Sequence, residues 1–156
     1  MKEGRAHRVA MGFGLFAGAV FLAIQLVPYG HRHSNPPIVV EPRWDGAATR
    51  GLAARACFDC HSNETRWPWY SNVAPASWMV QEHVDAGRRA LNFSEWNRAS
   101  EEASEAAEAV LEGEMPPASY LFAHPEARLT AAERSQLARG LVATVGRVGT
   151  DDGDDD

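Results

Sequence analysis

Cysteine is scarce in this chain of 156 residues, which contains only Cys57 and Cys60. A structural zinc site needs four ligands, and without a second cysteine pair the missing ones would have to be His83 or His124. No segment alternates apolar and polar residues as a half-buried strand does, so the strand–helix–strand pattern that accompanies a thiol redox pair is missing. The thiol chemistry is therefore confined to one short stretch.

A basic surface is also lacking. The formal net charge is -6, and most of it comes from the aspartates at the C-terminal end, so the rest of the chain is nearly neutral. Nucleic-acid binding requires clustered Lys and Arg, and we therefore expect no nucleic-acid partner. Residues 149–156 are predicted to form an acidic, disordered tail.

Charge is missing from residues 9–27, which as a helix would extend about 28 Å. A bilayer core is about 30 Å thick. Lys2, Arg5 and Arg8 precede this run, so residues 1–8 are expected to be cytoplasmic and residues 9–27 to form a single transmembrane anchor. The chain after it would lie outside the cytoplasm. A cleaved signal peptide and a buried core helix are the alternatives.

Residues 28–44 contain four prolines, which disfavour helix. We expect a semi-rigid, extended tether here, of which residues 38–40 could lie along the domain surface.

Residues 45–148 are predicted to form an all-α domain, since helical spacing and caps recur and no internal repeat is visible. The first helix is expected to be capped by Asp45 and to run toward Cys60. A second covers residues 74–89. A third starts at Asn92 or Ser94, ends at Gly113 and carries an apolar stripe. The final helix opens with a capping box at residues 130–133. The apolar stripes of the last two helices are expected to include Val110, Leu111, Leu137, Leu141, Val142 and Val145.

Cys57, Cys60 and His61 form the C-x-x-C-H pattern of covalent c-type haem attachment. Residues three apart on a helical turn share a face, so the two thiols can reach the two vinyl groups on one porphyrin edge. His61 then lies below the iron as a ligand. The pattern predicts one covalent haem c, with its iron, per chain. A disulfide or redox pair, a zinc site and a chance match are the alternatives.

A second axial ligand is expected downstream. Met115 is the leading candidate, because a thioether sulfur is a soft iron ligand and the two prolines that follow fix the loop presenting it. His83 is the alternative distal ligand, and Met79 and His124 compete with it. Met79 and His83 are four residues apart on one helix, where we expect core positions.

Several longer stretches resemble the haem-binding domain family, which is typical of membrane-anchored bacterial proteins. They are HSNETRWPWYS from His61 onward, APASW and HV in the second expected helix, and LNFSEW after it. The order of helix, haem motif, middle helices, Met115-Pro116 and C-terminal helix is also similar to a small class I cytochrome c. The resemblance covers about residues 25–145. It implies haem binding, with electron transfer at the periplasmic face of a bacterial inner membrane.

Aromatic residues follow the haem motif closely. The candidates to pack on the macrocycle are Trp67, Trp69, Tyr70, Trp78 and Trp96. Arg66, Trp67 or Tyr70 could bond its propionates. Burial in a small core would explain the same aromatics without a cofactor. A backbone carbonyl of Pro68 or Pro75 is expected to orient the far nitrogen of the histidine ligand.

Two filled axial positions leave no place for a substrate, so we expect a one-electron carrier that is not an enzyme by itself. Redox proteins would be its partners, together with the membrane. The alternative is a haem-based sensor or a peroxidase-like protein whose distal site is open or displaceable, with His83 as base or donor. A thiol–disulfide protein without haem is the third possibility.

Overall fold

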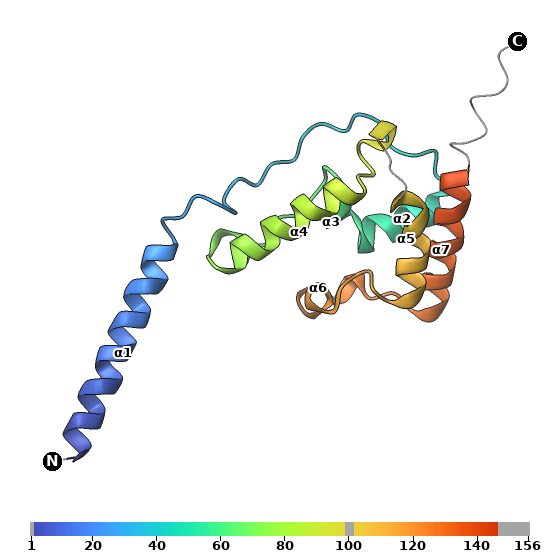
Figure 1. The fold of residues 1–156 in the computed structure, drawn as a ribbon. Coiled ribbons are helices and arrows are strands. Elements are labelled where there is room, and N and C mark those ends of the chain that lie inside the picture. Colours follow the sequence, from blue (N-terminus) through green and yellow to red (C-terminus); the bar gives the residue numbers. More distant parts are fainter. Residues whose placement is uncertain (1, 99–101, 147–156) are drawn as a thin grey trace, which may run out of the picture. The chain divides into compact units, whose positions relative to one another are not determined.

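The computed structural model describes residues 2–98 and 102–146, apart from the side chains of residues 2–6, 102, 104 and 146. Within this part of the chain the regular elements are all helices, which confirms the expected all-α class (Figure 1). The predicted acidic tail at 149–156 lies outside the described residues. The chain divides into two compact units, residues 1–33 with 67–82 and residues 34–66 with 83–156.

The first unit begins with α1, Lys2–Ile24. Its stretch His7–Ile24 is long and apolar enough to cross a membrane, and none of that stretch is buried. A helix in a soluble core would be buried, so the core-helix alternative is wrong. The helix ends at Ile24, short of the predicted residue 27. The unit also contains η1, Trp69–Asn72, and the first half of α4, Ala76–Ala90.

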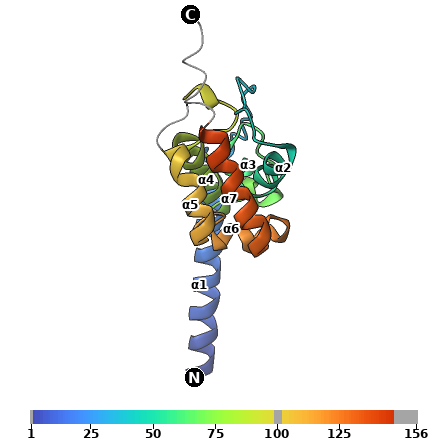
Figure 2. The same cartoon turned by 90° about the vertical axis from the view of Figure 1, so that its right-hand side faces the viewer.

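The second unit contains the remaining helices. In chain order they are α2 Ala47–Ala56, α3 Phe58–His61, the second half of α4, η2 Trp96–Arg98, α5 Glu102–Glu112, α6 Ala118–Ala123, η3 Pro125–Ala127 and α7 Ala131–Gly146. Helices α5 and α7 lie side by side in both views (Figures 1 and 2). Beside them, Phe93 stacks between Phe58 and Trp96, with ring centroids 5.6 and 5.9 Å away.

Helix α7 starts with the predicted capping box. The amide of Glu133 donates to Thr130 Oγ1 at 3.2 Å, and the amide of Thr130 donates to Glu133 Oε2 at 2.8 Å. Leu137 and Leu141 are buried as expected. Val142 is 62% exposed, so its expected inward position is wrong, because successive helical residues point about 100° apart.

The first predicted helix is divided. Helix α2 ends at Ala56 and α3 forms a separate turn. Asp45 does not cap α2, because the N-cap is Gly46 in extended geometry without a side-chain bond. The amide of Asp45 instead donates to Thr144 Oγ1 at 3.2 Å, which ties the start of α2 to α7.

The third helix begins later in the sequence than predicted. Trp96 lies in η2, and α5 starts only at Glu102. Ala103 and Val110 are buried on α5, whereas Leu111 is exposed and its expected inward position is wrong. The stretch from 114 to 129, between the last two predicted helices, contains α6 and η3.

Residues 34–44 of the predicted tether run along the second unit. The amide of Val39 donates to Ser94 O at 2.9 Å, and the amide of Trp96 donates to Val40 O at 3.0 Å. Val40 and Glu95 thereby form an isolated parallel bridge. This part of the chain is held by backbone bonds to the segment that precedes α5.

Candidate functional site

The two cysteines and His61 lie on a helical turn of their own. Cys57 separates α2 from α3, with φ -121° and ψ -34°. The amides of Cys60 and His61 both donate to Cys57 O, at 3.1 and 2.9 Å. Both cysteines are free thiols. Because residues three apart on such a turn share a face, the thiols of Cys57 and Cys60 are directed to the same side.

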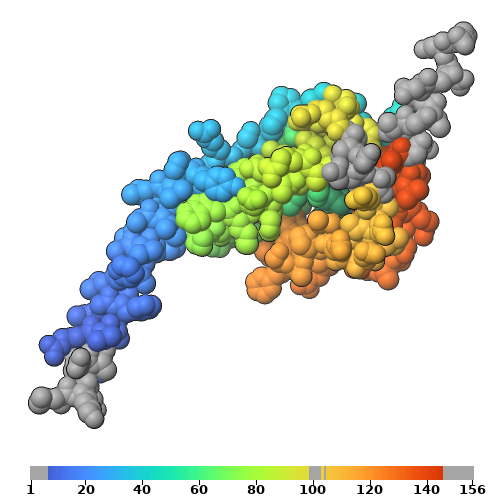
Figure 3. Space-filling view, viewed as in Figure 1, coloured from blue at the N-terminus to red at the C-terminus, as the bar shows by residue number. Residues whose placement is uncertain are grey.

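This turn borders a cavity of about 480 Å³ inside the second unit. Figure 3 shows the surface hollowed between the C-terminal half of α4 and the orange residues of α6. Sites for cofactors usually have volumes of roughly 300–1,000 Å³ and apolar walls with few polar groups. Cys57, Cys60 and His61 line this cavity together with Met115 and His83. Much of the remaining wall is small and apolar, including Ala86, Ala90, Ala106, Ala109, Val110 and Leu141.

His61 is oriented by the chain just beyond α4. Its Nδ1 lies 3.1 Å from the carbonyl oxygen of Leu91. A carbonyl can only accept, so Nδ1 carries the proton and Nε2 keeps its lone pair for a metal. The expectation that Pro68 or Pro75 supplies this carbonyl is wrong. Burial lowers the pKa of His61, which favours the neutral imidazole that a metal requires.

Helix α4 approaches the turn with the two cysteines closely at Gly87. A Cβ atom at this position would lie 2.5 Å from the carbonyl oxygen of Cys60 and 3.0 Å from its Cβ. Only glycine allows the two backbones to come this near. The close contact brings the cavity-lining face of α4 next to the two thiols.

The two leading distal candidates, Met115 and His83, line the same cavity. Met115 lies between α5 and α6, and its amide donates to Ala109 O at 3.1 Å. Met79 and His83 are exposed, so the expectation that they are core positions is wrong. The buried stripe of α4 includes Val84, and His83 lies on the neighbouring stripe that faces the cavity.

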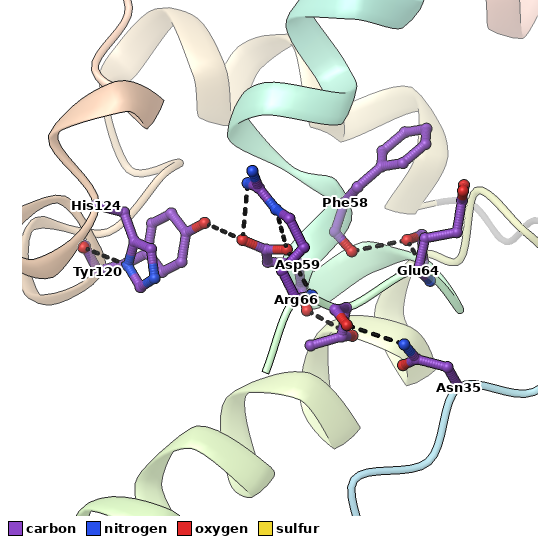
Figure 4. Close-up of polar contacts among 9 residues, drawn as sticks. Asn35, Phe58, Asp59, Glu64, Arg66, Tyr120 and His124 are labelled. Carbon is purple, nitrogen blue, oxygen red and sulfur yellow. Dashed lines mark hydrogen bonds and ion pairs between the residues drawn. The ribbon is translucent and has the colours of Figure 1, made fainter. Parts of the chain in front are cut away.

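Asp59, between the two cysteines, is a buried carboxylate that no motif in the sequence marks. Arg66 donates to it from Nε and Nη2 at 3.2 and 3.1 Å, and Tyr120 donates its hydroxyl to Oδ2 at 2.6 Å (Figure 4). Burial alone would raise the pKa of Asp59, but the bonds from Arg66 and Tyr120 outweigh burial and the pKa is lowered. Because Tyr120 is on α6, its bond to Asp59 joins α6 to the turn that carries the two cysteines. Tyr120 also lines the cavity.

The family model described as a haem-binding domain matches residues 19–143. The chain belongs to the haem-binding domain family. No match was found among curated proteins or among solved structures. The matched range includes both cysteines, His61, Met115 and the other residues that line the cavity.

The cavity of this haem-binding domain fits the group that the family binds. Two thiols and an imidazole with a free Nε2 come from one turn, and a thioether and a second imidazole, from Met115 and His83, reach the same cavity. These are the residue types that hold haem iron and attach its vinyl groups. The small apolar side chains around them suit a flat, apolar macrocycle.

The thiols of the haem-binding domain have raised pKa values. Burial raises the pKa of Cys57 to about 12 and that of Cys60 to about 11. Cysteines that exchange disulfides usually have lowered pKa values, because the thiolate is the nucleophile. The environment of Cys57 and Cys60 therefore weighs against the redox-pair alternative.

The other predicted site residues have separate surroundings. Arg66 is held by Asp59 in the second unit. Trp67 and Tyr70 belong to the first unit. There Trp67 stacks on His33, with ring centroids 4.6 Å apart, and Tyr70 and Trp69 meet edge to face, with ring centroids 5.8 Å apart. Contact of these three side chains with haem stays a prediction.

Proposed function

We propose that this haem-binding domain carries one covalent c-type haem, attached through Cys57 and Cys60 with His61 as an iron ligand. The convergence of both thiols and the available Nε2 of His61 on one apolar cavity carries this proposal. Each thioether forms by addition of a thiol S–H across a vinyl C=C bond, so the sulfur gains a carbon and the other vinyl carbon gains the hydrogen. No oxidant is consumed.

Met115 is the proposed second axial ligand, with His83 as the alternative. Thioether sulfur raises the reduction potential of a haem relative to a second imidazole and suits a carrier. The prolines after Met115 restrict the loop that bears it. Replacing Met115 or His83 tests which of the two is the iron ligand.

The proposed role is transfer of single electrons outside the cytoplasm, at the periplasmic face of a bacterial inner membrane that α1 spans. Bound haem iron supplies reversible one-electron chemistry. Two protein ligands leave no position for a substrate, so the chain acts as a carrier and not as an enzyme, with redox proteins as partners. The length and composition of α1 support the anchor.

Covalent attachment is tested by intact mass after expression with a cytochrome maturation system. The polypeptide should gain the mass of one haem, and a denaturing gel should keep the haem stain. Replacing both Cys57 and Cys60 with Ala should abolish both signals. A red wild-type protein at its bare polypeptide mass would show haem binding without covalent attachment, and a colourless one would contradict the proposal.

Ligation by Met115 is tested by the ferric absorption spectrum. The wild type should show the weak near-infrared band of methionine–iron ligation, Met115→Ala should lose it, and His83→Ala should keep it. A spectrum and potential that do not change in Met115→Ala would exclude Met115 as the ligand. A change confined to His83→Ala would identify His83.

A second candidate function follows from His83 and Glu105, which both line the cavity. If iron had an open or displaceable distal position, these side chains could handle protons for a bound gas or peroxide, as in a sensor or a peroxidase. Rapid binding of carbon monoxide to the reduced wild type favours this function. A six-coordinate haem that does not react favours the carrier.

A further inference from the structure

The loop that precedes α4 is joined to the end of α1 by a paired hydrogen bond. Gln25, the first residue after α1, donates its Nε2 to Ala74 O at 3.0 Å, and the amide of Ala74 donates to Gln25 Oε1 at 2.9 Å. The same Nε2 lies 3.0 Å from Phe21 O in the last turn of α1. Gln25 therefore fixes Ala74 at the helix end, and both residues belong to the first unit.

His33 also holds residues 67–74, which we call the aromatic loop, to the chain that leaves α1. His33 stacks on Trp67, with ring centroids 4.6 Å apart, and its Nε2 lies 3.0 Å from Ser71 O. Gly30, at φ +83°, packs against the carbonyl of Ser77 so closely that a Cβ would lie 2.6 Å from its oxygen. The aromatic loop is thus held by Gln25 and His33, and the first turn of α4 packs on Gly30.

The apolar stretch His7–Ile24 ends one residue before Gln25. Eighteen helical residues extend about 27 Å, close to the hydrocarbon thickness of about 30 Å. If α1 spans a bilayer, as the proposed function requires, Gln25 lies where the hydrocarbon ends. The hydrogen bonds to Ala74 then bring the aromatic loop to the same level, next to the lipid headgroups.

The aromatic loop presents a large side chain to its surroundings. Trp69 is 79% exposed, and Leu26, on the chain leaving α1, is 84% exposed. Exposure of these side chains to water is unfavourable. Moving an apolar side chain of this size from water into an apolar layer is favourable by a few kcal/mol of free energy. Indole rings are favoured at the boundary between headgroups and acyl chains, where the ring is in an apolar layer and its N–H stays near water.

We propose that Trp69 and Leu26 insert into the headgroup–acyl boundary of the membrane that α1 spans, so that the aromatic loop is a second, interfacial anchor. The inference rests on the proposed membrane anchor. It commits to lipid as the occupant because the Gln25–Ala74 bonds continue the α1–lipid boundary directly into this loop. The first unit would then be held at the membrane by a helix and a loop together.

Photo-crosslinking of the full haem-loaded chain tests this in nanodiscs of phosphatidylethanolamine and phosphatidylglycerol. We replace Trp69, Phe16 or Phe122 with p-benzoylphenylalanine and search for lipid adducts by mass spectrometry. Phe16 lies inside α1, and Phe122, on α6 of the second unit, is a matched control because it is 88% exposed. Adducts at positions 16 and 69 are expected, and position 122 reports the labelling of an equally exposed side chain in the second unit.

The outcomes separate the inference from the anchor on which it rests. Adducts at position 16 without adducts at 69 overturn the interfacial loop and leave the anchor intact. No adducts at 16 overturn both. Cross-links from position 69 to another protein, in place of lipid, also overturn it. An absorption spectrum equal to that of the wild type verifies that each variant is folded.

A second measurement leaves position 69 unchanged. The protein is labelled with 5-fluorotryptophan, and Trp69→Phe identifies the resonance of Trp69 in the ferrous state. A relaxation agent attached to lipid should broaden this resonance more than a soluble agent does. The reverse order would overturn the inference.

Discussion

At the scale of single residues, Asp59 is the least expected feature of the site. It lies inside the haem motif, is nearly inaccessible to solvent, and depends on Arg66 and Tyr120 for hydrogen bonds. A buried carboxylate without such donors would be strongly destabilising. The Tyr120 bond is the shortest of the set, at 2.6 Å, and links two segments 61 residues apart.

Replacing Tyr120 with Phe removes this donor and keeps the ring. We expect the free energy of unfolding to fall by about 1.5–3 kcal/mol, the usual contribution of a hydrogen bond to a charged group. Urea unfolding followed by circular dichroism measures it. Tyr29→Phe is the control, because the Tyr29 hydroxyl bonds Glu82 at an exposed position. Equal effects in the two variants would contradict a special role for the Asp59 bond.

Single residues also show which parts of the candidate site can be predicted from the sequence and which cannot. Cys57, Cys60, His61 and Met115 could be named as candidates from their chemistry and spacing, and all four line one cavity. Their roles toward haem stay a prediction. The carbonyl that orients His61 belongs to Leu91, and any residue type offers the same carbonyl, so nothing in the sequence marks it. Asp59 could have been noted from its place between the cysteines, but its partner Tyr120 is brought near only by the fold.

At the scale of elements, the helices were predicted better than their boundaries. The capping box of α7 was identifiable because it is a local pattern that the structure confirms. The start of α5 was placed too early, because Trp96 matches the helical stripe but lies in η2, where its ring stacks on Phe93. On α4, apolar residues face either the protein interior or the cavity, and periodicity alone does not separate these two faces.

The contact between α4 and α3 depends on Gly87. Gly87→Ala should gain up to ~1 kcal/mol of helix propensity but lose about 1–3 kcal/mol from overpacking. The loss should dominate, since the added Cβ meets the backbone carbonyl of Cys60, which no rotamer change can move. Gly51→Ala in α2 is the matched control.

At Gly51 a Cβ meets nothing within 4 Å, so the substitution should stabilise the protein. Urea titration of both variants measures the two changes in unfolding free energy. A Gly87→Ala variant as stable as Gly51→Ala would show that α4 can shift away from the haem motif without loss.

The N-terminus of α7 should respond to acid. The amide of Thr130 and the guanidinium of Arg55 bond the carboxylate of Glu133 and lower its pKa to about 2. A lowered pKa stabilises the fold above the ordinary value of about 4.3, and this contribution is lost as the pH falls toward 2. Glu133→Gln should therefore flatten the dependence of stability on pH between about 2 and 5.

Thermal unfolding of this variant at several pH values is compared with that of Glu108→Gln, a substitution on the exposed side of α5. The two variants should diverge as the pH rises from about 2 to about 4.3 and should differ by a constant amount above that range. Identical pH profiles would mean that the capping carboxylate does not contribute to the acid sensitivity of the protein.

At the scale of the whole molecule, two units with different physical tasks share one chain. The first combines α1 with the aromatic loop, and the second encloses the cavity. The family resemblance in the sequence predicted haem binding, but the division into units was not foreseen. It depends on long-range bonds such as Gln25 to Ala74, between residues 49 positions apart.

This division leads to a prediction about the chain without attached haem. Replacing Cys57 and Cys60 with Ala should lower the unfolding free energy of the second unit on the order of 5 kcal/mol, equivalent to the burial of two or three large side chains, because its apolar cavity wall then faces water. Hydrogen exchange should accelerate in α5 and α6, while the Ala74 amide, bonded to Gln25 in the first unit, should stay protected. Mass spectrometry of peptides from both forms measures this. Equal loss of protection at Ala74 would show that the two units unfold together, and unchanged exchange in α5 would show that haem does not support the cavity.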